Sequence, residues 1–348
     1  MEKAPKFRIV GNVSEETKSE AKKELQKMLF EEKHLQTIPK EKMAKLESLE
    51  YKKTAEELEL IDFANKKVSE LMVSVGVVPY DVPARNIHIV PPELYKEIVG
   101  KNNTLASTAQ RWQVIICDAE AVKSHPLQLA KISFHELIHL KGHLSLEVEE
   151  SASKKGKKIV GKTQFRGGLR VGSAQKMNRK DMGHEHFRGL NEAVTAAVER
   201  KFIESALDLP RFSKEKAWLS SSEALGIKKK LAKEKNIPEG EISWVDRDGK
   251  KFGTISYPHQ REVLYFVLQE IQKEFPEKYK SADEVMPEFL KGLFGDTLMP
   301  VGRLVEGAFG SGSFRVLGMM GPDRDTAVTV MEYLRGARRR VIRQKNAK

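Results

Sequence analysis

The chain has 348 residues, of which 40% are hydrophobic and 32% are charged, and its formal net charge is +12. No apolar run approaches the roughly 18–20 residues that span a bilayer, and residues 1–6 lack the apolar segment of a secretory signal, so we expect a cytoplasmic protein. The single cysteine, Cys117, excludes both a framework of intrachain disulfides and a cysteine-rich zinc site.

The residue pattern predicts an α+β chain that is mostly helical. Residues 14–75 are rich in Glu and Lys, with Leu and Met at helical spacing, which predicts two or three amphipathic helices. Short apolar runs at residues 86–90 and 111–118 are strand candidates. A helix is predicted between a cap at Ser124 and a stop signal at Gly142. We expect the two strands to form one small sheet packed beside this helix.

The second half of the chain is predicted to be helical apart from two segments. Residues 145–188 lack a helical pattern and contain several glycines, which predicts a β-hairpin or an irregular lobe flanking the cleft. The sequence Asp-Arg-Asp-Gly at residues 246–249 lies between two short apolar runs and predicts a second hairpin. We therefore divide the chain into an N-terminal amphipathic helical region (1–76), a core (77–210), a mainly helical C-terminal subdomain (211–334) and a basic tail (335–348).

His135 and His139 lie four residues apart in the sequence His-Glu-Leu-Ile-His, on the helix predicted above. Residues at this spacing share one face of a helix, so both imidazoles can reach a single metal ion. Glu136 then points close to the ion without needing to bind it. Two nitrogen ligands, a carboxylate base and room for a water molecule are the components of a catalytic zinc site.

The third protein ligand of such a site must come from elsewhere, because a catalytic zinc ion usually takes three and leaves one position open. Glu192 is the first candidate, since it lies at the start of a helix whose other face is apolar, and a second helix can present one carboxylate to the metal. His184 and His186 lie in a nearby loop and are alternatives. His143 continues the histidine series, but its angular drift and axial rise carry it away from a shared ion.

The sequence His135-Glu136-x-x-His139, followed by Asn191-Glu192 on a later helix, resembles the gluzincins, the thermolysin-like clan of zinc metallopeptidases. The resemblance covers about 60 residues. It implies that the core region is a zincin-like catalytic unit, that His135, His139 and Glu192 bind Zn²⁺, and that Glu136 activates the water.

The chain departs from the thermolysin pattern in two ways. Between His139 and Glu192 lie 52 residues, a longer insertion than in thermolysin. In that clan an acid four residues after the glutamate ligand orients a ligand histidine, but this position is Ala196 here. Glu199, one turn further along the same face, is the available replacement. The metzincin pattern fits less well, because its third histidine would fall at Ser145.

These residues predict a zinc metallopeptidase that hydrolyses a peptide or protein substrate. Glu136 would take the proton of the attacking water and pass it to the leaving amine. The oxyanion that develops needs a hydrogen-bond donor, for which Tyr257, His259 and the two loop histidines are candidates.

Two other functions are compatible with the sequence. A catalytically inactive zincin-like protein would use zinc for stability and recruit nucleic acid or an acidic partner through its basic surface. Positive charge gathers at residues 154–158, at residues 228–230 and in the tail, although no nucleic-acid-binding motif accompanies it. A protease dedicated to one target protein is the third reading.

Overall fold

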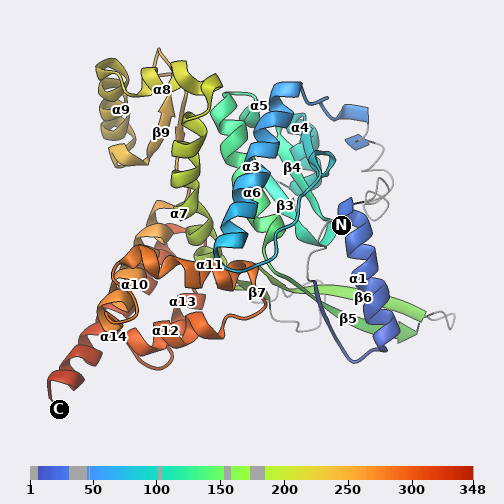
Figure 1. Cartoon of the computed structure of the whole chain (residues 1–348), viewed down its shortest axis with the longest axis vertical. Helices are drawn as coiled ribbons and strands as arrows, with labels where there is room; N and C mark the ends of the chain where they lie inside the picture. Colours follow the sequence, from blue (N-terminus) through green and yellow to red (C-terminus); the bar gives the residue numbers. More distant parts are fainter. Residues whose placement is uncertain are drawn as a thin grey trace.

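The computed structural model describes residues 7–30, 45–46, 48–100, 104–152, 158–172 and 185–347. Within them the chain is a mostly helical α+β protein with three small sheets, which confirms the predicted fold class (Figure 1). His184, Lys348 and most of the basic cluster at residues 154–158 lie outside the described residues.

The helices and strands have the following bounds. The longer helices are α1 (Glu15–Phe30), α3 (Ala55–Ser74), α6 (Pro126–Lys141), α7 (Arg188–Leu207), α9 (Ser222–Lys235), α10 (Pro258–Glu274), α12 (Met299–Phe309) and α14 (Arg324–Asn346). The shorter helices are α4 (Pro92–Val99), α5 (Ala119–Val122), α8 (Ser213–Leu219), α11 (Met286–Phe294) and α13 (Ser313–Gly318). The strands are β1 (Arg8–Val10), β2 (Ile87–Val90), β3 (Ala106–Ala109), β4 (Val114–Asp118), β5 (Leu144–Ala152), β6 (Lys158–Gly167), β7 (Arg170–Gly172), β8 (Glu185–His186), β9 (Ile242–Val245) and β10 (Phe252–Thr254). Among the helices described, none is both long enough and apolar enough to cross a membrane.

The small sheet predicted beside the motif helix is present and has a third strand. The two predicted strands are β2 and β4, which run parallel, and β3 pairs antiparallel with β4 at the edge. The sequence of β3 is Ala-Ser-Thr-Ala, and the sequence analysis missed it because only one of these residues is β-branched. α6 packs against this edge strand, where the Thr108 hydroxyl oxygen lies 3.0 Å from the carbonyl oxygen of Glu136.

α6 is the central helix of the protein, and 13 of its 16 residues are buried. The prediction that Ser124 is its N-cap is wrong. His125 is the N-cap instead and accepts a hydrogen bond from the Leu127 backbone N–H at 3.2 Å. The reason is that Pro126 occupies the first helical position, which makes the residue directly before it the cap. Gly142 ends the helix as predicted.

Residues 145–188 contain the predicted hairpin. β5 and β6 are its two antiparallel strands, and they belong to a sheet of the order β1-β5-β6-β7-β8. Figure 1 shows this long hairpin extending from the body of the molecule with α1 alongside it. α1 is held there by apolar packing of Leu25 and Met28 against Leu144 and Leu146.

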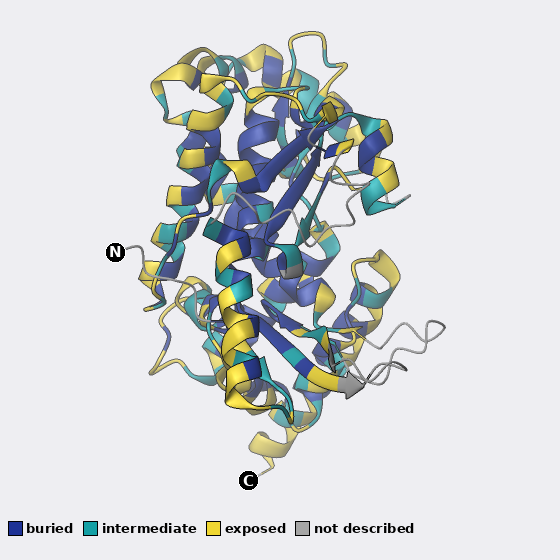
Figure 2. Cartoon of the chain, turned by 90° about the vertical axis from the view of Figure 1, so that its right-hand side faces the viewer, coloured by how far each residue is buried: buried dark blue, intermediate teal, exposed yellow. Residues whose placement is uncertain are grey.

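The second predicted hairpin is also confirmed, because β9 and β10 pair antiparallel across the Asp-Arg-Asp-Gly turn. The rest of the C-terminal half is helical, and α10 packs against α7, α12 and α14. One large apolar core joins these helices to α3, α6 and the small sheet. Figure 2 shows this core as the dark blue interior, with exposed residues on the outward faces of the helices.

The predicted basic tail is the last part of α14, and one of its cations is internal. Arg338 is buried, and its guanidinium donates hydrogen bonds to Glu270 and Glu274 of α10, each at 2.8 Å. Lys345 also pairs with Glu274. The remaining arginines of the tail are exposed, namely Arg335, Arg339, Arg340 and Arg343.

Substitution of Arg338 by Ala is expected to lower the free energy of unfolding by about 3 kcal/mol, because it leaves two glutamates without their buried partner. The neighbouring Arg339→Ala, which removes an exposed arginine from the same helix, is the matched control and should change stability by less than about 0.5 kcal/mol. Urea unfolding followed by circular dichroism measures both. Equal effects of the two variants would show that the α10–α14 pairs do not stabilise the fold.

Candidate metal centre

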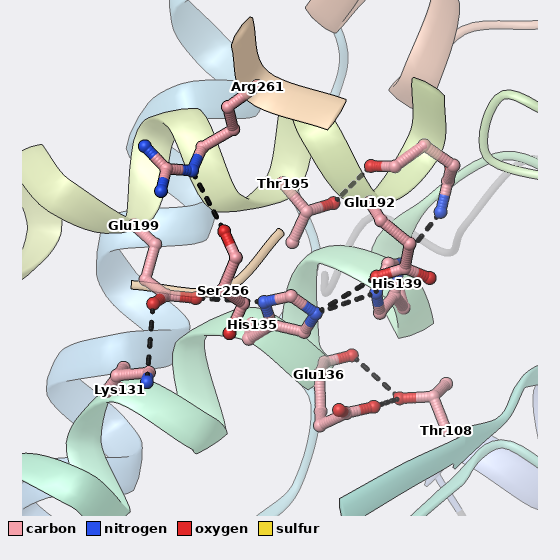
Figure 3. Close-up of polar contacts among 11 residues, drawn as sticks. Thr108, Lys131, His135, Glu136, His139, Glu192, Thr195, Glu199, Ser256 and Arg261 are labelled. Carbon is pink, nitrogen blue, oxygen red and sulfur yellow. Dashed lines mark hydrogen bonds and ion pairs between the residues drawn. The ribbon is translucent and has the colours of Figure 1, made fainter. Parts of the chain in front are cut away.

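Three side chains from two helices converge on one point. His135 Nε2 lies 3.1 Å from His139 Nε2 and 3.3 Å from Glu192 Oε2, and the last two atoms are 3.2 Å apart (Figure 3). A tetrahedral ion with metal–ligand bonds of about 2.0–2.1 Å requires neighbouring ligand atoms to be about 3.3 Å apart. The three residues therefore form a group that can hold a metal ion.

The meeting of α6 and α7 brings the group together. The two histidines occupy one face of α6, and Glu192 lies in the first turn and a half of α7. The rings of Phe134 and Phe202 stack between the two helices with centroids 4.1 Å apart. The start of α7 is fixed by Gly189, where a Cβ atom would lie only 2.3 Å from the carbonyl oxygen of Gly321, so a larger residue would push the helix away.

Glu199 contacts His135 at Nδ1, the ring nitrogen that faces away from His139 and Glu192. Its Oε2 lies 3.0 Å from Nδ1 of His135, and its side chain is completely buried. The sequence indicates Glu199 as the available replacement for an acid at position 196, and the structure places it in contact with His135. Helical side chains lean toward the N-terminus of their helix, so a long glutamate one turn further along can reach back over a buried alanine.

Asn191 contacts His139 in the same way, because its Nδ2 lies 3.0 Å from Nδ1 of His139. Its Oδ1 accepts a hydrogen bond from the Leu169 backbone N–H at 2.9 Å. When His139 binds a metal through Nε2, its proton resides on Nδ1 and must be donated. Asn191 is the side chain that lies at this Nδ1 atom, and the Leu169 N–H fixes the orientation of its amide.

Lys131 compensates the buried charge of Glu199. Its ammonium lies 3.6 Å from Glu199 Oε1 and donates a hydrogen bond to the Thr254 carbonyl oxygen at 2.6 Å. Burial raises the pKa of Glu199, but Lys131 and His135 hold it below the usual range of a glutamate. A charged carboxylate is therefore available to accept the Nδ1 proton of His135.

The charges of the group favour a proton on His135 when no metal is bound. Burial lowers the pKa of this imidazole, but hydrogen bonds to Glu192 and Glu199 raise it to about 10. Burial likewise raises the pKa of Glu192, yet His139 and His135 hold it well below the ordinary value. A cation held by this group would take the place of the proton on His135 Nε2, and the proton on His135 Nδ1 would stay hydrogen-bonded to Glu199.

Glu136 lies beside the metal-binding group but is not one of its three potential ligands. Its Oε2 accepts a hydrogen bond from the Thr108 hydroxyl at 2.7 Å (Figure 3). Thr108 is a site residue that sequence reasoning missed, because it comes from the unpredicted strand β3. Its contact fixes the carboxylate at the edge of the pocket, close to the metal-binding group.

A pocket of about 140 Å³ opens onto the group and is lined by Glu136, Tyr257 and all three potential ligands. A second pocket of about 310 Å³ adjoins it, and Tyr257 lines both. The Tyr257 ring stacks on His135 with centroids 6.2 Å apart. Burial, together with Glu192 and Glu136, raises the pKa of this phenol, which therefore keeps its proton and can donate a hydrogen bond.

The other predicted histidines are placed differently. His259 lies in the first turn of α10 and lines neither pocket, and His186 in β8 also lines neither. His143 is buried beyond the end of α6, and its Nε2 lies 2.9 Å from the Ser145 hydroxyl. The structure thus brings Tyr257 to the pocket but leaves these three histidines away from it.

Comparison of the chain with protein-family models, with curated proteins and with solved structures gives no match. What the site can do is therefore inferred from its own residues. They establish an α+β protein in which two histidines and a glutamate are arranged to hold a metal ion.

Substitution of Glu192 by Ala is expected to abolish stable metal binding, because it removes one of three ligands. The loss of affinity should exceed the about 100-fold that removal of an outer contact can cost. Zinc content after dialysis measures it, with Glu204→Ala on an exposed part of α7 as the control. Full zinc retention in Glu192→Ala would remove this glutamate from the ligand set.

Substitution of Glu199 by Gln should weaken metal binding by about 10- to 100-fold without abolishing it, because a neutral amide accepts the Nδ1 proton of His135 less strongly. Competition with a zinc chelator gives the dissociation constant, and Glu204→Gln serves as the matched control. An unchanged constant would mean that Glu199 has no influence on the metal.

Proposed function

We propose that the protein is a zinc-dependent metallopeptidase. The observation that carries the proposal is the convergence of two imidazoles and one carboxylate at tetrahedral spacing, on the wall of a pocket that also holds an unligated glutamate. A mixed set of nitrogen and oxygen ligands suits zinc, whereas magnesium and calcium take oxygen ligands. Three protein ligands leave one position for a water molecule or a substrate, as in catalytic rather than structural zinc sites.

In this proposal each side chain has a defined task. A zinc ion bound by His135, His139 and Glu192 would supply Lewis acidity that polarises a carbonyl group and acidifies water. Glu136, oriented by Thr108, accepts the proton of the attacking water and delivers it to the leaving amine. Tyr257 donates a hydrogen bond to the oxyanion.

The edge of β3 that faces away from β4 supports the proposal of a peptide substrate. Leu105 O accepts a hydrogen bond from the Asp118 backbone N–H, so the alternation of an antiparallel ladder leaves the backbone groups of Ala106 and Thr108 facing away from β4. Within the described chain, no other strand pairs with this edge. An extended peptide can add to it as a further strand and pass in front of Glu136.

The main alternative is a zinc-stabilised binding protein without catalysis, whose exposed arginines on α14 recruit nucleic acid or an acidic partner. Four exposed arginines near the end of this helix support it. Removal of the tail beyond residue 338 would keep the internal Arg338 and delete three of the four exposed arginines, together with Lys345. Unchanged retention on nucleic acid at low salt would reject that role.

The test of the proposal is cleavage of a peptide library that stops with a zinc chelator and returns with added zinc. Glu136→Gln should keep its zinc and lose about 10²- to 10⁴-fold in kcat/KM, the usual contribution of a general base. Glu204→Gln is the control and should be as active as the original protein. Full proteolysis by a zinc-loaded Glu136→Gln protein would contradict the mechanism.

A further inference from the structure

Two arginines share the pocket with the metal-binding group. Arg170 comes from β7 and Arg188 is the first residue of α7, and both line the same pocket as the potential ligands. Arg188 precedes Glu192 by one helical turn and therefore lies on the same face of α7. Tyr257 lines the same pocket as Arg188.

Among the residues that the structure describes, the two guanidiniums form ion pairs with Glu185 alone. Buried arginines bind other groups of the protein: Arg166 donates hydrogen bonds to the carbonyl oxygens of Gly168 and Gly292, and Arg261 pairs with Glu241. In contrast, neither Arg170 nor Arg188 donates a side-chain hydrogen bond to any residue that the structure describes. Their nearest acid is Glu185, whose carboxylate lies 3.6 Å from one and 3.9 Å from the other, beyond hydrogen-bond distance.

The acidic residues of the pocket are engaged by other groups, so the two arginines are available to bind an anion. Glu192 belongs to the metal-binding group, and the Glu136 carboxylate is held by Thr108. The guanidinium fork matches the two oxygens of a carboxylate, and such charge-assisted pairs are stronger than neutral hydrogen bonds. Glu185 already draws both arginines toward one carboxylate, although loosely and at the partly exposed rim. A substrate carboxylate entering the pocket would find ten N–H donors, five on each arginine.

We propose that Arg170 and Arg188 select substrates that carry a carboxylate close to the scissile bond. This inference rests on the proposed peptidase function and adds its substrate class. The carboxylate belongs either to an Asp or Glu side chain or to the C-terminus of a short peptide, and both have the chemistry that the arginines recognise.

The experiment compares matched peptides that differ only in this group: Glu against Gln, Asp against Asn, and a free C-terminus against its amide. The zinc-loaded protein should cleave the carboxylate form with a kcat/KM about 10- to 100-fold higher, the range expected for a charge-assisted hydrogen bond. A preference at an internal position identifies the side chain as the source, and a preference lost on amidation identifies the C-terminus.

The variants Arg170→Gln, Arg188→Gln and their combination should reduce cleavage of carboxylate peptides and leave the neutral peptides unchanged. Arg303→Gln, an exposed arginine on α12, is the matched control and should keep the full preference. Both substituted side chains are partly exposed, with 36% and 48% of their surface accessible, so the variants should fold. No preference in the original protein, or a full preference in the double variant, would overturn the inference.

Binding provides a readout that does not depend on catalysis. Zinc-loaded Glu136→Gln protein is titrated with the same Glu and Gln peptides by fluorescence anisotropy, and the Glu peptide should bind at least about 10-fold more tightly. If the original protein cleaves no peptide but this difference appears and is lost in the double variant, the peptidase function fails while the carboxylate site stands. Equal binding of both peptides would overturn the carboxylate site itself.

Discussion

Two packed helices carry all three residues of the potential metal-binding group, so the way in which α6 meets α7 decides whether these residues lie together. α6 is buried on nearly all sides and cannot shift without disturbing the core. α7 is held against it by the stacked rings of Phe134 and Phe202, and the start of α7 packs closely on residues 320–321 at Gly189. Apolar packing thereby holds the three potential ligand atoms 3.1–3.3 Å apart.

The same packing buries charged groups of opposite sign next to each other. Glu199 is completely buried between His135 and Lys131, and the ammonium of Lys131 is in turn hydrogen-bonded to a backbone carbonyl. A buried carboxylate without a cation would be strongly destabilising. The contact between Glu199 and His135 is therefore inseparable from the electrostatics of the core.

The cleft combines features from parts of the chain that are distant in sequence. β3 supplies an open edge and the hydroxyl that holds Glu136, α10 supplies Tyr257, and β7 and α7 supply two arginines. A peptide paired with β3 would pass the potential general base and the potential metal while its carboxylate meets the arginines. The proposed substrate class thus follows from the same surface as the proposed reaction.

The sequence by itself determined those features of the structure that depend on residues only a few positions apart. The spacing of His135 and His139 placed two imidazoles on one helical face, and the second hairpin followed from its turn residues, because both depend on neighbours within a few positions. It also pointed to Glu192 and Glu199 through helical periodicity. Only the tertiary structure decided that these residues meet the histidines, that Thr108 holds Glu136 and that Tyr257, rather than His259, reaches the pocket. These contacts join segments separated by tens of residues, and their distances depend on how buried faces pack, which no local pattern encodes.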